Sequence, residues 1–364
     1  MISFFGRNSI RPIGLEIGRQ SIRLLQLNMT PARALVVAAA HSALRRPFEL
    51  SNVRETAELI RGLRGRAPFV GAKVHAALPA SMVQFRTIRL KNVLAAQLET
   101  EARREVAGLL PFDLSEALLR VMPAGLVHEG GELCQEVIVA AVRSEDSRSL
   151  LQLLDDAGLE TASLQIQPLA AYRAVARLAA VNQPMMLIDV AEEQTCVTIG
   201  IGPKISFVRM IDIGTHAIEQ CIVRRLGVRQ SEVGAILQRV NSAAEGRRDA
   251  VATAVFDATR GLLEELATHI AMCLRYVAIS FRESMPSQAI LIGTEARNPH
   301  LCAALSSHLS LPITSIDPFA GLETAAMEQS IGGERSSWSI ALGLGLPDIS
   351  PSLNQISENR TLAA

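Results

Sequence analysis

One pattern of residues occurs twice in this chain, once near its start and once about halfway along. Each copy is an apolar run that ends in an acid, followed by a tight turn and a second apolar run. The copies are Ile13 to Leu25, with Glu16 as the acid, and Leu187 to Ile199, with Asp189 as the acid. An acid at the end of a buried strand suits Mg²⁺ or its bound water, and a turn with exposed backbone N–H groups suits phosphate. The repetition therefore predicts two related lobes whose hairpins face one cleft.

The bulk composition fits a chain with large buried cores. Its 364 residues are enough for two or three domains, and hydrophobic residues make up 49 %. The 36 basic and 36 acidic residues cancel, so no overall charge would attract nucleic acid. No window approaches the roughly 18–20 uninterrupted apolar residues of a membrane span. We therefore expect a cytoplasmic protein without a membrane span and without a nucleic-acid partner.

The cysteine and histidine patterns predict no structural metal site. The five cysteines are scattered and form no C-x-x-C pair, and the seven histidines form no H-E-x-x-H motif. Reduced, buried thiols are what this scatter favours.

Strand and helix patterns divide the chain into a lobe, an insertion and a second lobe. Between 81 and 157 the order strand, helix, strand, strand and helix predicts a small α+β unit. A helix at 338–345 is expected to cross back to the first lobe. The predicted units are a first lobe at 1–80, 158–184 and 338–364, an inserted unit at 81–157, and a second lobe at 185–337.

Five short segments resemble motifs of the PilM family of type IV pilus assembly proteins, relatives of the cell-division protein FtsA in the actin superfamily. The segments are Gly14 to Arg23, Leu110 to Leu114, Ile166 to Ala170, Ile211 to Gly214 and Ile340 to Leu344. Each is short, but together they follow the family's order along nearly the whole chain. The resemblance implies an α/β, actin-like two-lobed fold, which is a duplicated ribonuclease H-like unit, with an inserted α+β subdomain of the SHS2 type.

The same resemblance implies a role as an adaptor in a membrane-associated machine. Family members lie on the cytoplasmic face of the inner membrane and bind the cytoplasmic tail of PilN, a bitopic membrane protein. The cytoplasmic domain of GspL, from type II secretion, is the nearest competing identity. We therefore expect an adaptor of the inner-membrane platform of a type IV pilus or type II secretion-like machine, in contact with a PilN- or GspL-type protein, the motor ATPase and other platform components. An ATP-hydrolysing enzyme and a filament-forming cytoskeletal protein stay open as alternatives.

The resemblance also places ATP and Mg²⁺ in the cleft. Glu16 and Asp189 are then the candidate Mg²⁺ ligands, through water, and Gln167 is a candidate for orienting the attacking water. The candidate cofactor-binding residues are Glu16, Gly18, Arg19, Gln20, Ser21, Arg23, Asp189, Thr195, Gly214, Gly293, Thr294 and Arg297.

Several of these positions depart from the family pattern. Arg19 and Gln20 stand where the family has small turn residues, and Ala191 stands where it has a glycine. Gln167 replaces a glutamate that polarises water, and an amide is a poor base. Glu295 is expected to place a carboxylate near the phosphates and repel them. We therefore predict a degenerate site that binds ATP and Mg²⁺ weakly if at all, and no working ATPase.

A strand and the helix after it supply the surface on which we expect the partner to bind. The resemblance implies that an extended PilN-type peptide enters a groove between the first lobe and the inserted unit. Strand 83–90 alternates polar and apolar residues, and helix 94–108 carries an apolar face. The predicted groove residues are Arg86, Arg89, Leu94 and Leu98. The two arginines would meet carboxylates or carbonyls of the peptide; the alternative is that they are ordinary surface arginines.

Overall fold

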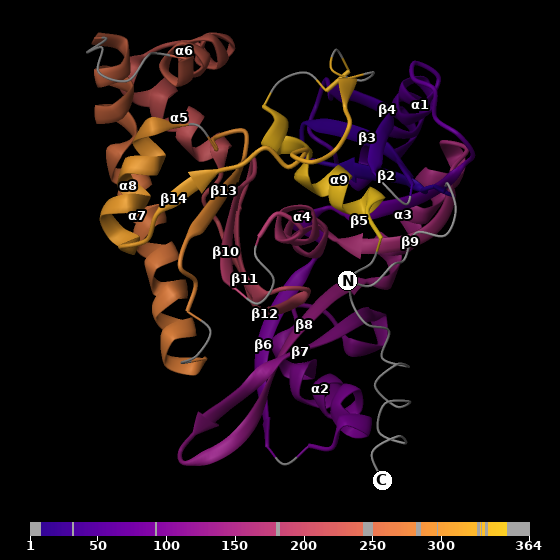
Figure 1. Cartoon of the computed structure of the whole chain (residues 1–364), viewed down its shortest axis with the longest axis vertical. Helices are drawn as coiled ribbons and strands as arrows, with labels where there is room; N and C mark the ends of the chain where they lie inside the picture. Colours follow the sequence, from indigo (N-terminus) through magenta and orange to yellow (C-terminus); the bar gives the residue numbers. More distant parts are fainter. Residues whose placement is uncertain are drawn as a thin grey trace.

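The computed structural model describes most of the chain, and every statement below concerns these residues. They are 9–30, 33–91, 93–179, 183–242, 250–281, 285–296, 298–325, 328, 330–331 and 334–347. Their strands form sheets of six, five and three strands. Figure 1 shows two lobes side by side, each with a sheet, and a smaller unit below them. Within the described residues, no helix combines the length and the apolar content that crossing a bilayer requires.

The first lobe is built on the six-stranded sheet, in the order β1-β3-β2-β5-β9 with β4 beside β3. Its strands are β1 (Ser9–Ile10), β2 (Ile13–Ile17), β3 (Ser21–Met29), β4 (Ala34–Ala43), β5 (Lys73–Leu78) and β9 (Glu160–Ile166). Strands β2 and β3 form the first predicted hairpin and place Glu16 opposite Arg23. Side chains alternate along a strand, so Leu24 and Leu25 of β3 enter cores on opposite faces of the sheet.

Four helices cover the two faces of this sheet. They are α1 (Val53–Arg64) and α3 (Ser144–Asp156) on one face, and α4 (Gln167–Ala176) and α9 (Ser339–Gly345) on the other. A short turn of 3₁₀ helix, η7 (Arg335–Trp338), leads into α9. The last helix thus returns to the first lobe, as the sequence predicts. Ala341 and Leu342 of α9 share a core with Leu25 of β3.

The second lobe is built on the five-stranded sheet, in the order β12-β11-β10-β13-β14. Its strands are β10 (Pro184–Val190), β11 (Thr195–Ile201), β12 (Lys204–Ile211), β13 (Ala289–Gly293) and β14 (Ile313–Ser315). Its helices are α5 (Thr215–Leu226), α6 (Gln230–Ser242), α7 (Ala250–Ser280) and α8 (Pro299–Leu309). Strands β10 and β11 form the second predicted hairpin, with Asp189 opposite Cys196.

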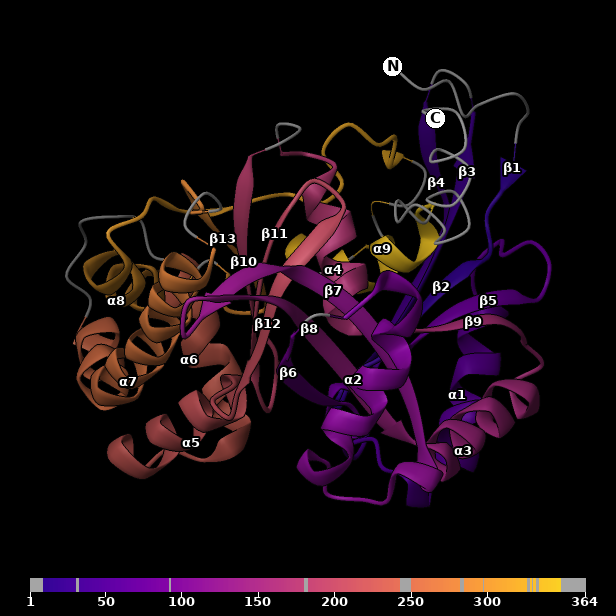
Figure 2. The ribbon, with the colours of Figure 1, turned by 90° about the horizontal axis from the view of Figure 1, so that it is seen from below.

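The smaller unit is a three-stranded antiparallel sheet with one α-helix on its outer face. Its elements are β6 (Gln84–Lys91), α2 (Leu98–Val106), β7 (Ala117–Glu129) and β8 (Glu132–Arg143), with the strand order β6-β8-β7. Ala102 and Val106 of α2 pack on this sheet. The inner face joins both lobes, because Val142 belongs to the core of the first lobe and Ile138 to that of the second. Figure 2 shows this unit lying across both lobes.

Two elements of this region differ from the sequence prediction. The helix predicted at 94–108 is shorter, because 3₁₀ turns at Ala95–Gln97 and Ala107–Leu109 flank α2. Helix α3, which the prediction assigns to the inserted unit, packs Leu150 and Leu153 into the core that also holds Ile60 of α1. Its packing therefore favours a boundary near the end of β8, and the division at 157 stays a prediction.

Candidate functional site

A cavity of about 510 Å³ lies between the two hairpins. Predicted residues from both lobes line it: Glu16, Gly18, Arg19, Ser21, Arg23, Gln167, Asp189, Gly293 and Thr294. The strand ends bring them together, because β2 and β10 each run toward the cleft before their turns. Gly293 ends β13 with φ +96°, a backbone conformation that glycine adopts without strain.

Other predicted cofactor residues do not line this cavity. Gln20 lies in the β2–β3 turn, where its carbonyl accepts a hydrogen bond from the Leu44 N–H. Thr195 is fully buried, and its Oγ1 donates to the Ile213 carbonyl over 2.6 Å. Gly214 precedes α5, and Arg297 lies outside the described residues.

The expectation for Glu295 is wrong. Its side chain does not line the cavity but is buried, with its carboxylate accepting a 2.6 Å hydrogen bond from Asn298 Nδ2. Asn298 in turn caps α8 through the backbone N–H groups of His300 and Leu301. Glu295 therefore supports a helix start and adds no charge to the wall of the cleft.

Ion pairs and burial set the electrostatics of the cleft. Arg23 lies 3.2 Å from Glu16 across the first hairpin, and Arg19 lies 3.0 Å from Glu193 of the second lobe. Burial raises the pKa of Glu16, and the charge of Arg23 opposes that rise. Burial raises the pKa of Asp189 to about 7, with a further rise from the charge of Glu16. The carboxyls are crowded enough that they resist carrying their charges together.

The turn of the second hairpin is bonded to both lobes. Burial raises the pKa of Glu192 to about 7, and the backbone N–H of Gln20 in the first lobe opposes that rise. The Ala191 and Glu192 carbonyls accept hydrogen bonds, each 2.9 Å long, from the Thr215 and His216 N–H groups at the start of α5. Donors at a turn and at a helix N-terminus are those that a phosphate would use, and here they already have partners.

The charged residues that line the cavity are mostly acidic. Two arginines line the cavity, and each is already paired with a carboxylate. The acidic side chains of the lining are more numerous: Glu16, Asp189, Glu192, Glu193 and Asp212. A polyphosphate would meet an acidic wall and no free cation among these lining residues. Among the described residues, no three His, Cys, Asp or Glu side chains converge to hold a metal ion.

Sequence reasoning missed two groups that line the cleft. Glu192 and Glu193 follow the Asp189 strand directly, so an acidic pair in the turn was the available signal. Ser336, Ser337 and Ser339 come from η7 and α9, far along the chain. Ser336 Oγ donates to the Gly293 carbonyl over 2.9 Å and so holds the β13 loop to the first lobe. A run of serines before a helix carries no signal for such a contact.

A second cavity, of about 500 Å³, lies between the first lobe and the inserted sheet. Its walls include Leu118 to Arg120 of β7 and Ser163 to Ile166 of β9. Both strands are terminal in their sheets. The charged or titratable side chains of this lining are basic or neutral: Arg11, His75, Arg120 and Arg173. We call this cavity the β7–β9 groove.

The predicted partner residues lie outside the β7–β9 groove. Arg86 Nε donates to the Leu109 carbonyl over 2.8 Å, and Leu98 is half-buried against the core under α2. Leu94, which precedes that helix, is 67 % exposed. These residues therefore share the outer side of the inserted unit.

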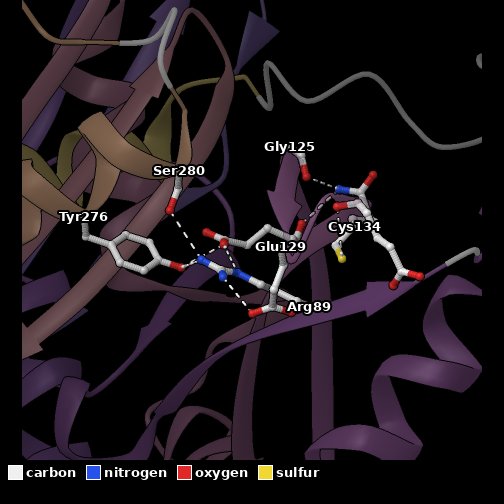
Figure 3. A network of polar contacts seen from close by, with 9 residues as sticks. Arg89, Gly125, Glu129, Cys134, Tyr276 and Ser280 are labelled. Atoms are coloured by element: carbon white, nitrogen blue, oxygen red, sulfur yellow. Dashed lines mark hydrogen bonds and ion pairs between the residues drawn. The ribbon is translucent and has the colours of Figure 1, made fainter.

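Arg89 joins the inserted unit to the second lobe. Its guanidinium forms ion pairs with Glu129 and the fully buried Glu136, at 2.9 and 3.1 Å. It also donates to the hydroxyl groups of Tyr276 and Ser280 on α7, as Figure 3 shows. A side chain held by this many contacts is positioned for structure, since a buried carboxylate such as that of Glu136 requires a charged partner.

Comparisons with known proteins agree with this architecture. A family model described as type IV pilus assembly protein PilM matches residues 14–348. A solved structure described as a PilM-PilN type IV pilus biogenesis complex is similar with a TM-score of 0.74 and 23 % identity, covering 94 % of this chain and 99 % of that one. Ethanolamine utilization protein EutJ from Carboxydothermus hydrogenoformans is similar with a TM-score of 0.56 and 11 % identity, covering 92 % and 89 %. No curated protein matches. The predicted actin-like α/β fold is confirmed.

Proposed function

Because the chain belongs to the PilM family of type IV pilus assembly proteins, we propose that it binds the cytoplasmic segment of a PilN-type bitopic membrane protein in the β7–β9 groove. The segment would hold the protein at the cytoplasmic face of the inner membrane, as a peripheral component of the pilus platform. The similar solved structure is described as a complex with PilN, which supports this choice of partner.

The observation that carries the proposal is a groove flanked by two terminal strands. An extended peptide pairs its backbone with the unpaired edge of a sheet and places alternate side chains in pockets beside it. Leu118 of β7, 51 % exposed, offers an apolar contact inside the groove. Arg120 is exposed beside it, so the groove favours a peptide with an acidic side chain near its apolar anchor.

The groove can be tested against the surface predicted from the sequence. The variant L118D/R120E should weaken binding of a synthetic PilN cytoplasmic segment at least tenfold in fluorescence anisotropy, because it removes the apolar contact and reverses a charge. The matched variant R86E/L98D changes the outer side of the inserted unit and should bind as the wild type does. Circular dichroism must show that both variants are folded, since Leu98 is half-buried.

Each result has a definite meaning. Loss of binding only in R86E/L98D would move the site to the outer side of the inserted unit, where Arg86, Leu94 and Leu98 lie. Unchanged binding in both folded variants would exclude both surfaces and leave the second lobe as the candidate.

We also propose that the cleft is a degenerate nucleotide site. Its paired arginines and acidic wall support this. Isothermal titration calorimetry with Mg-ATP should give a dissociation constant no tighter than about 100 µM, or about −5.5 kcal/mol. Micromolar binding that is lost in D189N would contradict the proposal and favour the alternative of an ATP-binding enzyme.

A further inference from the structure

The two hairpins touch across the cleft through adjacent acidic side chains. Glu193 Oε1 of the second lobe lies 3.0 Å from Arg19 Nε of the first lobe. The Gln20 backbone N–H, in the same turn as Arg19, is near enough to the neighbouring Glu192 carboxylate to oppose the rise of its pKa. A guanidinium of the first lobe is therefore paired with one carboxylate of the opposite lobe, and a turn N–H stabilises the charge of the next.

These two donors are of the kind that binds phosphate. A turn N–H and an arginine bind the oxygens of phosphates and of carboxylates alike, because both groups present several anionic acceptors. We propose that Glu192 and Glu193 are built-in replacements for nucleotide phosphates, which hold the two lobes together and exclude polyphosphate from the cleft. This inference rests on the proposed degenerate site and does not depend on where the PilN segment binds.

The backbone around Glu192 fixes the turn in the position that this role requires. The Glu192 carbonyl accepts from His216 of its own lobe, while its carboxylate is stabilised by the Gln20 N–H of the other lobe. The Ala191 carbonyl accepts from Thr215 beside it. One short turn thus occupies both the donors of the first hairpin and the N-terminal donors of α5.

The two contacts contribute differently. The Arg19 and Glu193 side chains are 35 % and 47 % exposed, so water screens their attraction and the ion pair is weak. Glu192 is half-buried, and its attraction to the Gln20 backbone N–H is less screened. Glu192 should therefore contribute most of the attraction that holds the two lobes together, and Glu193 should mainly keep Arg19 paired.

The test uses the whole chain and the variant E192A/E193A. The matched control is E264A/E265A, which removes two adjacent exposed glutamates from α7 and changes the net charge equally. Amide hydrogen exchange at Gln20 reports the Glu192 contact directly. Calorimetric titrations with inorganic pyrophosphate and with Mg-ATP report access of polyphosphate to the freed donors.

We expect Gln20 exchange to become at least tenfold faster in E192A/E193A, and polyphosphate affinity to rise at least tenfold, about 1.4 kcal/mol. The control should match the wild type in both. Unchanged Gln20 exchange would overturn the inference, and so would faster exchange without any gain in polyphosphate affinity. Tight Mg-ATP binding by the wild type would instead contradict the degenerate site itself, so the two failures are distinguishable.

A second variant keeps the inference testable if the first one does not fold. E192Q/E193Q retains side chains of the same shape and an amide oxygen that can accept from Gln20, but it removes both charges. Polyphosphate affinity should then rise, although less than in E192A/E193A. No rise in the folded variant would overturn the role of the two charges.

Discussion

Gly343 of α9 lies where two helices approach most closely. A Cβ atom built on this glycine would overlap the carbonyl group of Ala170 in α4. Both helices cover the same face of the first sheet, so neither has room to withdraw without leaving its core.

G343A should therefore lower the free energy of unfolding by about 3 kcal/mol or more, because overpacking forces backbones apart. The control is G62A in α1, where a Cβ meets nothing within 4 Å and alanine is the better helix former. G62A should raise stability by about 0.5–1 kcal/mol. Urea unfolding measures both, and a G343A variant within 1 kcal/mol of the wild type would show that α4 and α9 are less closely packed.

Glu295 should make the stability of the protein depend on pH. Burial raises the pKa of its carboxyl, and the bond from Asn298 opposes that rise. A folded-state pKa above the unfolded value means that the native state binds the proton more tightly. The contribution of Glu295 is then fully present below the unfolded pKa of about 4.5 and is lost as pH rises through the folded pKa.

The variant E295Q keeps the shape of the side chain but has no carboxyl group that can titrate. Wild type should therefore lose stability relative to E295Q as pH rises from 4 to 7, in unfolding curves taken at each pH. The exposed Glu99, changed to glutamine, serves as the control and should show no such divergence. If the free energies of unfolding of wild type and E295Q differed by the same amount at every pH, Glu295 would not be protonated preferentially in the folded state.

The sequence predicted which residues lie at the cleft better than it predicted the directions and partners of their side chains. Glu16 and Asp189 end strands, and a strand end is visible in the pattern of apolar residues. The direction of Glu295 depends on Asn298, and the contacts of Arg89 depend on Tyr276, which is 187 positions away. Such partners are set by tertiary packing, which no local pattern records.

At the scale of elements, the packing of α3 suggests a different border for the inserted unit. Gln84 at the start of β6 pairs with Ala141 near the end of β8. The chain therefore enters and leaves the three-stranded sheet at neighbouring positions. Helix α3 follows β8 and packs on α1 of the first lobe. A cut before α3 should therefore keep Leu150 and Leu153 in the first core, which then loses only its border with the inserted sheet, Ala140 and Val142.

Replacing 84–143 by a short Gly-Ser linker should leave a protein with one cooperative thermal transition. Replacing 81–157 should abolish that transition, because it removes Leu150 and Leu153 from the core of the first lobe. Calorimetry compares the two deletions directly. The border at 157 would be supported if the longer deletion kept the sharper transition.

Across the whole molecule, the two lobes could be predicted because their hairpins repeat within a short stretch of sequence. The β7–β9 groove could not, since its walls come from β5, β7, β8, β9 and α4. Strand 83–90 alternates as predicted, but β7 is the terminal strand that borders the groove. Which edge of a sheet faces a neighbour follows from how the units dock, and the alternation of residues is the same for either edge.

The return of α9 to the first lobe has a consequence for how the protein is made. This helix rests on β2, where a Cβ on Gly14 would overlap the Ala341 carbonyl, and it covers Leu25 and Leu27 of β3. At roughly 5–20 residues per second, a ribosome needs on the order of 20–70 s to reach α9 after making β2. Throughout that time the part of this face that α9 covers stays open and available to chaperones, because α4, which is made earlier, covers only its own part. The first lobe is begun first and completed last, so a ribosome that stalls before residue 339 releases a chain that lacks the cover of its earliest strands.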